Sequence, residues 1–167
     1  MEYDSITDYL SGIGKTLLST QDMKKKGLVN IGRYRDLATR GLDALIGRFN
    51  YVVLLTPVRS ETNGHWIIII RHHDGYEFFD SYGGMPDQWI KNFPPLLSKI
   101  PFQFINDHQF QSIQPNVSTC GRWVILRWMF RDISLEDFQH AFGQRVVLTP
   151  DQLCTLIVRK ENGNNRG

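Results

Sequence analysis

The five residues from Trp66 to Ile70 (WIIII) constrain the fold more than any other segment of the sequence. A continuous aromatic and β-branched run predicts a strand, and its lack of polar alternation predicts that both faces of this strand are covered. A strand that is buried on both faces needs another layer of structure on each side of its sheet. We therefore expect a sheet at the centre of the fold.

Three other segments have the composition of strands. They are Tyr51–Leu55 (YVVLL), which is stopped by Pro57, Tyr76–Phe79 (YEFF) and Phe102–Ile105 (FQFI). His72–Gly75 (HHDG) separates two of the strands and contains Asp-Gly, which is a strong hairpin signal. The sequence therefore predicts a small, mostly antiparallel sheet.

Helical patterns lie on both sides of these strands. Cys120–Phe130 (CGRWVILRWMF) has apolar residues at spacings of three and four, which predicts a buried helix. Two more helices are expected around Leu135–Phe142 and from Pro150 onward, where Thr149 is a natural N-cap. The N-terminal third has helical spacing around Leu37 to Leu45. The expected fold is α+β, with the sheet packed against a central helix that begins at Cys120 and further helices flanking it.

Length and composition favour one globular domain. The chain has 167 residues, of which 41% are hydrophobic and 12% aromatic, enough to bury a substantial core. We expect a single domain over residues 1–160. The tail over residues 161–167 is polar and rich in Gly and Asn, so we expect it to be flexible.

The net charge and the targeting signals of the sequence limit which partners and which location we expect for the protein. The formal net charge of +2 permits contact with nucleic acid but does not argue for it, and the run Lys24–Lys26 is typical of a solvated helix end. The longest apolar strings fall short of the roughly 20 residues that span a bilayer, and the acidic N-terminus is unlike a secretory signal. We expect no membrane partner and a location inside a host cell, in its cytoplasm or nucleus, or in a virion.

Cys120 has the setting of a reactive thiol. It follows a loop and directly precedes the apolar helix, and the unpaired N–H groups of a helix N-terminus stabilise a thiolate and can face an oxyanion. Gly121 is expected to keep the space beside the sulfur open to a substrate backbone. The other cysteine, Cys154, is not in a C-x-x-C pattern with it, so neither a disulfide framework nor a metal motif is indicated.

His65 is the histidine best placed to act as a base. It stands at the start of the WIIII strand, after Gly64, whereas His72 and His73 read as polar turn residues and His108 and His140 as surface residues.

The hairpin brings Asp80 to the same sheet face as His65. A loop over residues 72–75 would pair Arg71 with Tyr76 and set Asp80 opposite Ile67, whereas a turn of residues 74–75 alone would set it opposite Ile69. Both registers leave Asp80 on the face of His65, because residues two apart on a strand point the same way. A carboxylate that orients an imidazole completes a nucleophile–base–orienter set.

These residues resemble the cysteine proteases of clan CE, which include adenovirus endopeptidase and the SUMO and ubiquitin-like-protein proteases. The resemblance is carried by His65-Trp66, Asp80-Ser81 and QPNVSTCG from Gln114 to Gly121, in that order, and spans about half of the chain. The resemblance implies that Cys120 is the nucleophile, His65 the base, Asp80 its orienter and Gln114 an oxyanion donor beside the Cys120 amide.

The same resemblance implies a protein or polyprotein substrate with a cleavage site after small, Gly-Gly-like residues and no cofactor or metal. The positions assigned to substrate binding are Gly64, Trp66, Ser118 and Gly121, with Trp66 roofing the channel. The expected activity is that of a cysteine endopeptidase in viral protein maturation.

The sequence departs from the family at two positions. Thr119 stands where the SUMO proteases usually carry Asp, and Arg122 stands where an apolar residue is more common. Together with the short chain, these departures favour the viral branch. Three alternatives stay open: an isopeptidase acting on ubiquitin or a ubiquitin-like protein, an acetyltransferase on the same fold, and a catalytically silent binding domain.

Overall fold

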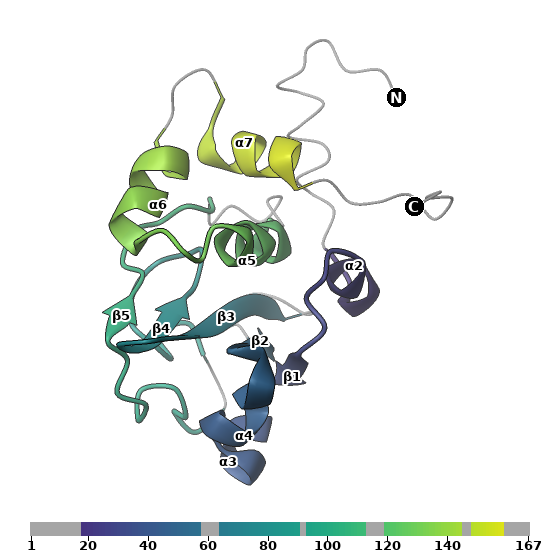
Figure 1. Cartoon of the computed structure of the whole chain (residues 1–167), viewed down its shortest axis with the longest axis vertical. Coiled ribbons are helices and arrows are strands. Elements are labelled where there is room, and N and C mark those ends of the chain that lie inside the picture. The colour runs from purple at the N-terminus through teal and green to yellow at the C-terminus, as the bar shows by residue number, and fades with distance from the viewer. Residues whose placement is uncertain (1–17, 58–63, 91–92, 113–118, 145–147, 159–167) are drawn as a thin grey trace.

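A five-stranded sheet lies at the centre of the molecule (Figure 1). The computed structural model describes residues 18–57, 64–90, 93–112, 119–144 and 148–158. The strands follow one another in the sheet in the order of the sequence. They are β1 (Ile31–Arg33), β2 (Tyr51–Thr56), β3 (His65–His72), β4 (Gly75–Phe79) and β5 (Phe104–Ile105).

The sheet is antiparallel at its centre and parallel at both edges. β2, β3 and β4 form two antiparallel pairs, while β1 runs parallel to β2 and β5 parallel to β4. The strands expected over residues 51–55, 66–70 and 76–79 are confirmed, whereas only Phe104 and Ile105 of the expected Phe102–Ile105 strand join the sheet. β1 was not expected from the sequence.

Helices cover both faces of this sheet, so the α+β fold is confirmed. α5 (Cys120–Met129), α6 (Leu135–Phe142) and α7 (Pro150–Ile157) lie on one face, and α3 (Asp36–Arg40) and α4 (Leu42–Ile46) on the other (Figure 1). α2 (Thr20–Lys25) flanks the sheet, and the 3-10 helix η1 (Gly47–Phe49) leads into β2.

Local signals define several of these helix ends. Thr149 caps α7 through a reciprocal capping box, with Pro150 in the first turn as expected. Gly41, with φ of +79°, separates α3 from α4, so the helical pattern around Leu37 to Leu45 forms two short helices. Lys24 and Lys25 are exposed at the end of α2, as predicted for this basic run, while the tail over 161–167 lies outside the described residues.

β3 is covered on both faces, as its sequence predicts. Trp66, Ile68 and Ile70 pack into a core cluster with α5, whereas Ile67 and Ile69 pack into a second cluster on the side of α3 and α4. All five side chains are at most 2% exposed. The strand thus joins the two halves of the core.

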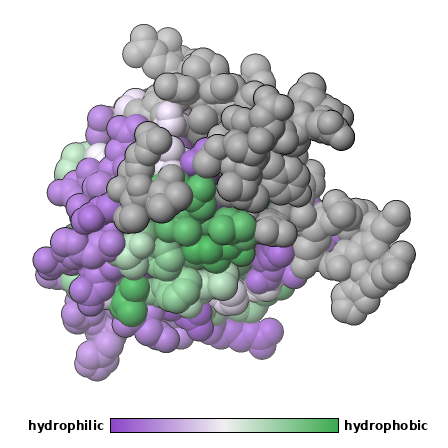
Figure 2. Space-filling model, turned by 90° about the horizontal axis from the view of Figure 1, so that it is seen from above, coloured by the Kyte–Doolittle hydropathy of each residue, from purple (hydrophilic) through white to green (hydrophobic). Residues whose placement is uncertain are grey.

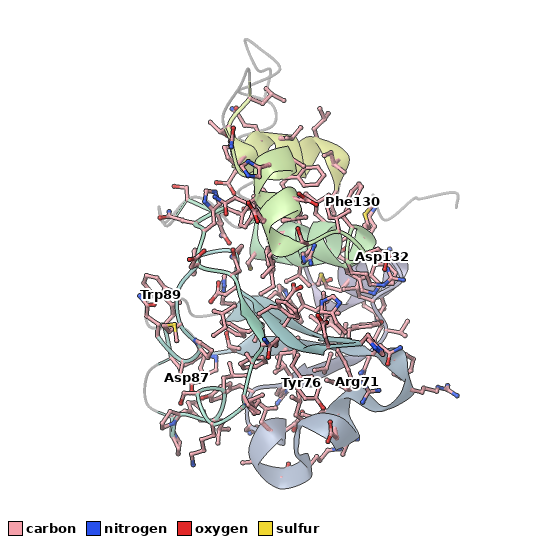
Figure 3. All side chains as sticks on the ribbon, turned by 60° about the vertical axis from the view of Figure 1, so that its left-hand side comes forward. Arg71, Tyr76, Asp87, Trp89, Phe130 and Asp132 are labelled. Atoms are coloured by element: carbon pink, nitrogen blue, oxygen red, sulfur yellow. The ribbon has the colours of Figure 1, made fainter. Side chains whose placement is uncertain are left out.

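The hairpin between β3 and β4 combines the register of one expected arrangement with the two-residue turn length of the other. Arg71 pairs with Tyr76 as in the first of the two registers, and both lie at the hairpin end of the sheet in Figure 3. His72 also pairs with Gly75, which leaves residues 73 and 74 as the turn in place of a four-residue loop. Because Ile68 pairs with Phe79, Asp80 emerges from the sheet at the end where β3 begins.

A buried ion pair fastens α5 to the sheet. Arg127 of α5 donates from Nε and Nη2 to the two carboxylate oxygens of Glu77 on β4, at 2.8 Å each. His72 lies 2.9 Å from the same carboxylate. Burial raises the pKa of Glu77, but the bonds from Arg127 and His72 outweigh it, so the pKa is lowered from its ordinary value.

The outer side of the helical layer exposes some apolar surface. Figure 2 looks down on this layer and shows a hydrophobic patch beside hydrophilic surface. Exposed large hydrophobic residues of the layer include Met129 on α5 and Ile157 on α7. In the part of the chain that the structure describes, none of the helices has the length and apolar character needed to cross a bilayer.

Candidate active site

His65 and Asp80 meet where β3 begins and β4 has just ended. The His65 Nε2 lies 2.7 Å from Asp80 Oδ1, and their side chains are only 1% and 7% exposed. The same Asp80 oxygen accepts the backbone N–H of Tyr82 at 2.9 Å. The Tyr82 ring stacks on the imidazole with 4.2 Å between the ring centroids, which fixes the plane of the imidazole. The sequence analysis did not identify Tyr82.

Cys120 is the first residue of α5, as the sequence predicts, and α5 packs against β3. Asp151 of α7 holds the start of this helix. Asp151 Oδ1 accepts hydrogen bonds from Thr119 Oγ1 at 2.5 Å and from Trp123 Nε1 at 3.0 Å, while Oδ2 accepts the backbone N–H of Ser112 at 2.8 Å. Burial raises the pKa of Asp151, and these three donors oppose that shift. In the sequence Asp151 resembles an ordinary first-turn acid of a helix, so only the tertiary structure reveals it.

The imidazole of His65 interacts with two groups that favour its protonated form. Its complete burial lowers its pKa, but Asp80 and the thiolate form of Cys120 outweigh this effect and hold the pKa of His65 well above its ordinary value. Asp80 occupies Nε2, and Nδ1 has no hydrogen-bond partner among the described residues. Nδ1 is therefore the ring nitrogen that Asp80 leaves available.

This arrangement differs from the surroundings of the other described histidines and of the second cysteine. His72 binds Glu77, His108 Nε2 lies 3.0 Å from the Gly143 carbonyl oxygen, and His140 is exposed on α6. The thiol of Cys154 is buried on α7, and burial raises its pKa well above the ordinary value. Of the two thiols, Cys120 is the one that contributes to the raised pKa of an imidazole, that of His65.

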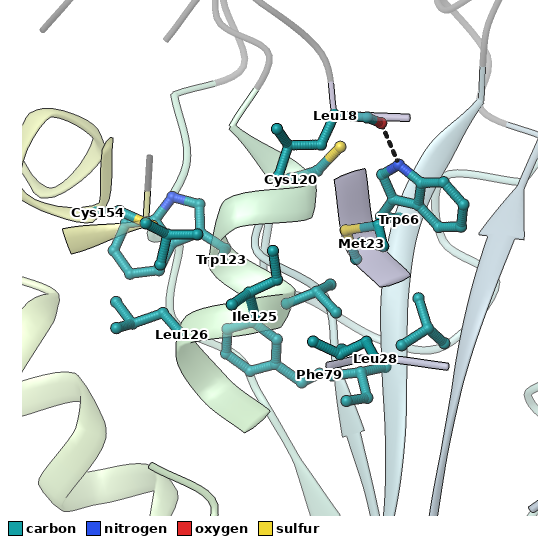
Figure 4. Packing of buried hydrophobic residues seen from close by; sticks show 14 of the residues in the cluster. Leu18, Met23, Leu28, Trp66, Phe79, Cys120, Trp123, Ile125, Leu126 and Cys154 are labelled. Atoms are coloured by element: carbon teal, nitrogen blue, oxygen red, sulfur yellow. Dashed lines mark hydrogen bonds between the residues drawn. The ribbon is translucent and has the colours of Figure 1, made fainter. Parts of the chain in front are cut away.

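Leu18 covers the Cys120 thiol in this structure. Figure 4 shows Leu18 beside the sulfur, with its carbonyl oxygen accepting a hydrogen bond from Trp66 Nε1 at 3.0 Å. A Cβ atom at Gly121 would lie 3.1 Å from Leu18 Cβ and 3.3 Å from both Met23 Sδ and Trp66 Cδ1. The expectation that Gly121 leaves open space is therefore wrong here, because the segment that leads into α2 fills that space. Cys120 is only 1% exposed.

Gly64, directly before His65, is closely surrounded by residues of β2. Its φ is +84°, and a Cβ atom there would come within 2.9 Å of Leu55 Cδ1 and 3.0 Å of the Thr56 carbonyl oxygen. Glycine is therefore required where the chain turns into β3. Two further predicted residues, Gln114 and Ser118, lie outside the described residues.

Groups of three or more His, Cys, Asp or Glu side chains that could hold a metal do not occur in the described segments. The thiol, the imidazole and the carboxylate come from α5, β3 and the residue after β4. A carboxylate that orients an imidazole next to a thiol can activate that thiol as a nucleophile.

The fold and the site define an α+β protein with a thiol, an imidazole and a carboxylate gathered at the N-terminus of a central helix. Over 136 aligned residues the chain is 31% identical to the uncharacterized protein V9 of Sputnik virophage, and the alignment covers 70% of this chain and 77% of the virophage protein. The chain belongs to the family of that protein. No family model and no solved structure matches the chain.

Proposed function

We propose that the chain is a cysteine endopeptidase that cleaves after small residues and acts in the maturation of viral proteins. The observation that carries the proposal is the buried His65, which is bound to Asp80 through Nε2 and interacts with the thiol of Cys120. Burying polar and charged side chains costs free energy unless each has a partner, so this set is unfavourable for a purely structural role. The virophage relative supports the viral setting.

The proposed reaction proceeds through an acyl-enzyme. His65 takes the proton of Cys120, and the thiolate attacks the carbonyl carbon of the scissile peptide bond, forming a C–S bond. The carbonyl oxygen becomes an oxyanion that faces the backbone N–H groups at the start of α5, the amide of Cys120 among them. The imidazolium then gives its proton to the leaving amine as the C–N bond breaks.

Water completes the cycle. His65 takes a proton from a water molecule, which attacks the thioester carbon, and the C–S bond breaks to release the new carboxyl terminus and the thiol. Asp80 orients the imidazole and stabilises the imidazolium in both halves of the reaction. The role of Gln114 as a second oxyanion donor rests on the resemblance to clan CE alone.

Two cysteine variants test the proposal. The parent, Cys120→Ala and Cys154→Ala are incubated with a peptide library made from a digested proteome, and mass spectrometry identifies new chain ends. We expect the parent and Cys154→Ala to cleave after small residues and Cys120→Ala to be inactive. Equal cleavage by Cys120→Ala and the parent would refute the proposal.

A labelling experiment tests the activated thiol without a substrate. Intact-mass analysis during iodoacetamide treatment at near-neutral pH compares the two cysteines in the parent and in His65→Ala. Cys120 should react faster than Cys154 in the parent and should lose this advantage in His65→Ala. Equal, slow labelling of both thiols in both proteins would contradict an imidazole-activated nucleophile.

A further inference from the structure

A cavity of about 320 Å³ opens at the end of the sheet next to His65. Gly64 and Thr56 form part of its wall. Gly64 directly precedes His65, while Thr56 pairs with His65 across the sheet and donates from Oγ1 to its carbonyl oxygen at 2.9 Å. The cavity therefore borders the backbone of His65, through the residue before it in the chain and through its partner across the sheet.

Two cationic side chains at this cavity have no anionic partner in the described segments. Arg33 at the end of β1 and Arg35 just before α3 are both exposed and both line the cavity. The nearby carboxylate of Asp36 accepts the backbone N–H of Arg33, at 2.9 Å, and does not form an ion pair with its guanidinium. The cavity thus presents two guanidinium groups, which suit the planar, bidentate binding of carboxylates.

Two aromatic side chains also line the cavity, and one of them is held by hydrogen bonds. Tyr34 and Phe93 line it, with their rings edge to face at 6.2 Å between centroids. The Tyr34 hydroxyl donates to Asp87 Oδ1 at 2.6 Å, and burial together with this bond raises the pKa of Tyr34 to about 12. Asp87 lies on the connection that follows β4 (Figure 3) and also accepts the backbone N–H groups of Leu97 and Ser98. Tyr34, fixed in this way, loses little entropy when a ligand binds.

We infer that this cavity recognises the protein substrate through an acidic residue with an apolar neighbour, close to the cleaved bond. The inference rests on the proposed endopeptidase function and adds the substrate class to it. Arg33 and Arg35 bind the carboxylate, and the Tyr34–Phe93 wall receives the apolar side chain. An acidic segment beside the small residues at the cleavage site then distinguishes substrates from other Gly-Gly-containing chains.

A binding assay on the full chain with Cys120→Ala tests the inference without turnover. The ligand is a fluorescein-labelled peptide that carries Leu-Glu-Glu before Gly-Gly, and its matched versions carry Gln or Lys in place of both glutamates. Fluorescence anisotropy should show about three- to tenfold tighter binding of the glutamate peptide than of the glutamine peptide, as expected for two partly solvated ion pairs. Arg33→Glu and Arg35→Glu should each remove most of this difference, and together they should favour the lysine peptide.

Arg48→Glu is the matched control, because Arg48 is an exposed arginine on η1, at the opposite end of β2 from Thr56. It makes the same charge change and should leave the preference intact. Equal binding of the three peptides, no binding at all, or the same loss in Arg48→Glu would overturn the inference. Cys120 alkylation in otherwise unmodified chains separates the two proposals: if only the cavity assignment fails, the thiol keeps its His65-dependent reactivity, and if the proposed function fails, that reactivity is absent.

Discussion

Replacing Asp80 by asparagine separates the charge of this residue from its role as a hydrogen-bond acceptor. Asp80 Oδ1 accepts from both His65 Nε2 at 2.7 Å and the backbone N–H of Tyr82 at 2.9 Å. The Tyr82 N–H can only donate, so it holds the side-chain oxygen of an asparagine in the same position. The amide nitrogen then replaces Oδ2, for which the described residues show no hydrogen bond. In Asp80→Asn both hydrogen bonds remain, and only the negative charge is lost.

The structure gives the size of the expected effect. A hydrogen bond to a charged group contributes about 1.5–3 kcal/mol and a neutral one about 0.5–1.5 kcal/mol, so the loss of charge costs about 1–1.5 kcal/mol. We therefore expect about tenfold slower alkylation of Cys120 at neutral pH in Asp80→Asn, together with a lowered pKa of His65. Asp80→Ala leaves two buried donors unsatisfied at about 1–3 kcal/mol each, which corresponds to roughly 30- to 10⁴-fold slower alkylation of Cys120.

The same substitutions predict how stability depends on pH. The pKa of His65 is raised in the folded protein, so the stability that His65 contributes is fully present below its ordinary pKa of 6.5. This contribution is lost as the pH rises through the raised, folded value. The difference in unfolding free energy between the parent and Asp80→Asn, measured in urea, should therefore be largest in mild acid and shrink at alkaline pH.

The assay is the rate constant for iodoacetamide at Cys120, measured by intact mass in the parent, Asp80→Asn and Asp80→Ala. Cys154 is the internal control, because burial raises the pKa of this thiol in all three proteins. We expect the order parent, Asp80→Asn, Asp80→Ala, from fast to slow. Equal rates in Asp80→Asn and Asp80→Ala would refute the reasoning, because acceptor geometry would then contribute nothing.

Two further perturbations test the cover over the thiol and the buried ion pair. Leu18→Gly should accelerate alkylation of Cys120 but not of Cys154. Leu28→Ala, in the same core cluster, is the control and should leave the alkylation of Cys120 unchanged. Equal acceleration of Cys120 alkylation in the two variants would indicate a general loosening of the core. Glu77→Gln leaves the charge of Arg127 buried without its partner and should cost about 3–5 kcal/mol in urea unfolding. Glu136→Gln, whose native side chain is 84% exposed, should be nearly neutral, and a similar loss in both variants would contradict the role of the ion pair.

Local patterns predict the part of the site that lies on one hairpin. The WIIII run, the HHDG turn and the period of two along a strand bring Asp80 to His65, and neither of the two expected registers separates them. The exact turn does not follow from the sequence, because His72 and Gly75 are able to pair or to loop out. The position of Cys120 at a helix start likewise follows from the apolar helix after it.

Contacts between distant segments are not predictable in this way. β1 has only three residues, Ile31–Arg33, and exists because β2 offers it a parallel edge. Leu18 contacts Trp66, which lies 48 residues further along the chain, and the sequence around Leu18 does not predict this contact. In the sequence, Arg33 and Arg35 resemble ordinary surface charges. Only the tertiary structure shows that they line a cavity together with residues of β2 and Phe93.

The site depends on two anchors that lie far apart in the sequence. The hairpin and the Tyr82 ring position the imidazole of His65 on the sheet. Asp151 positions the start of α5, because it binds Thr119 and Trp123 on either side of Cys120. Each anchor holds its own group without the other, and the core contact between α5 and β3 joins the two. The relative placement of the imidazole and the thiol is therefore a product of core packing, and we expect substitutions in that interface to affect it as directly as substitutions at His65 or Cys120.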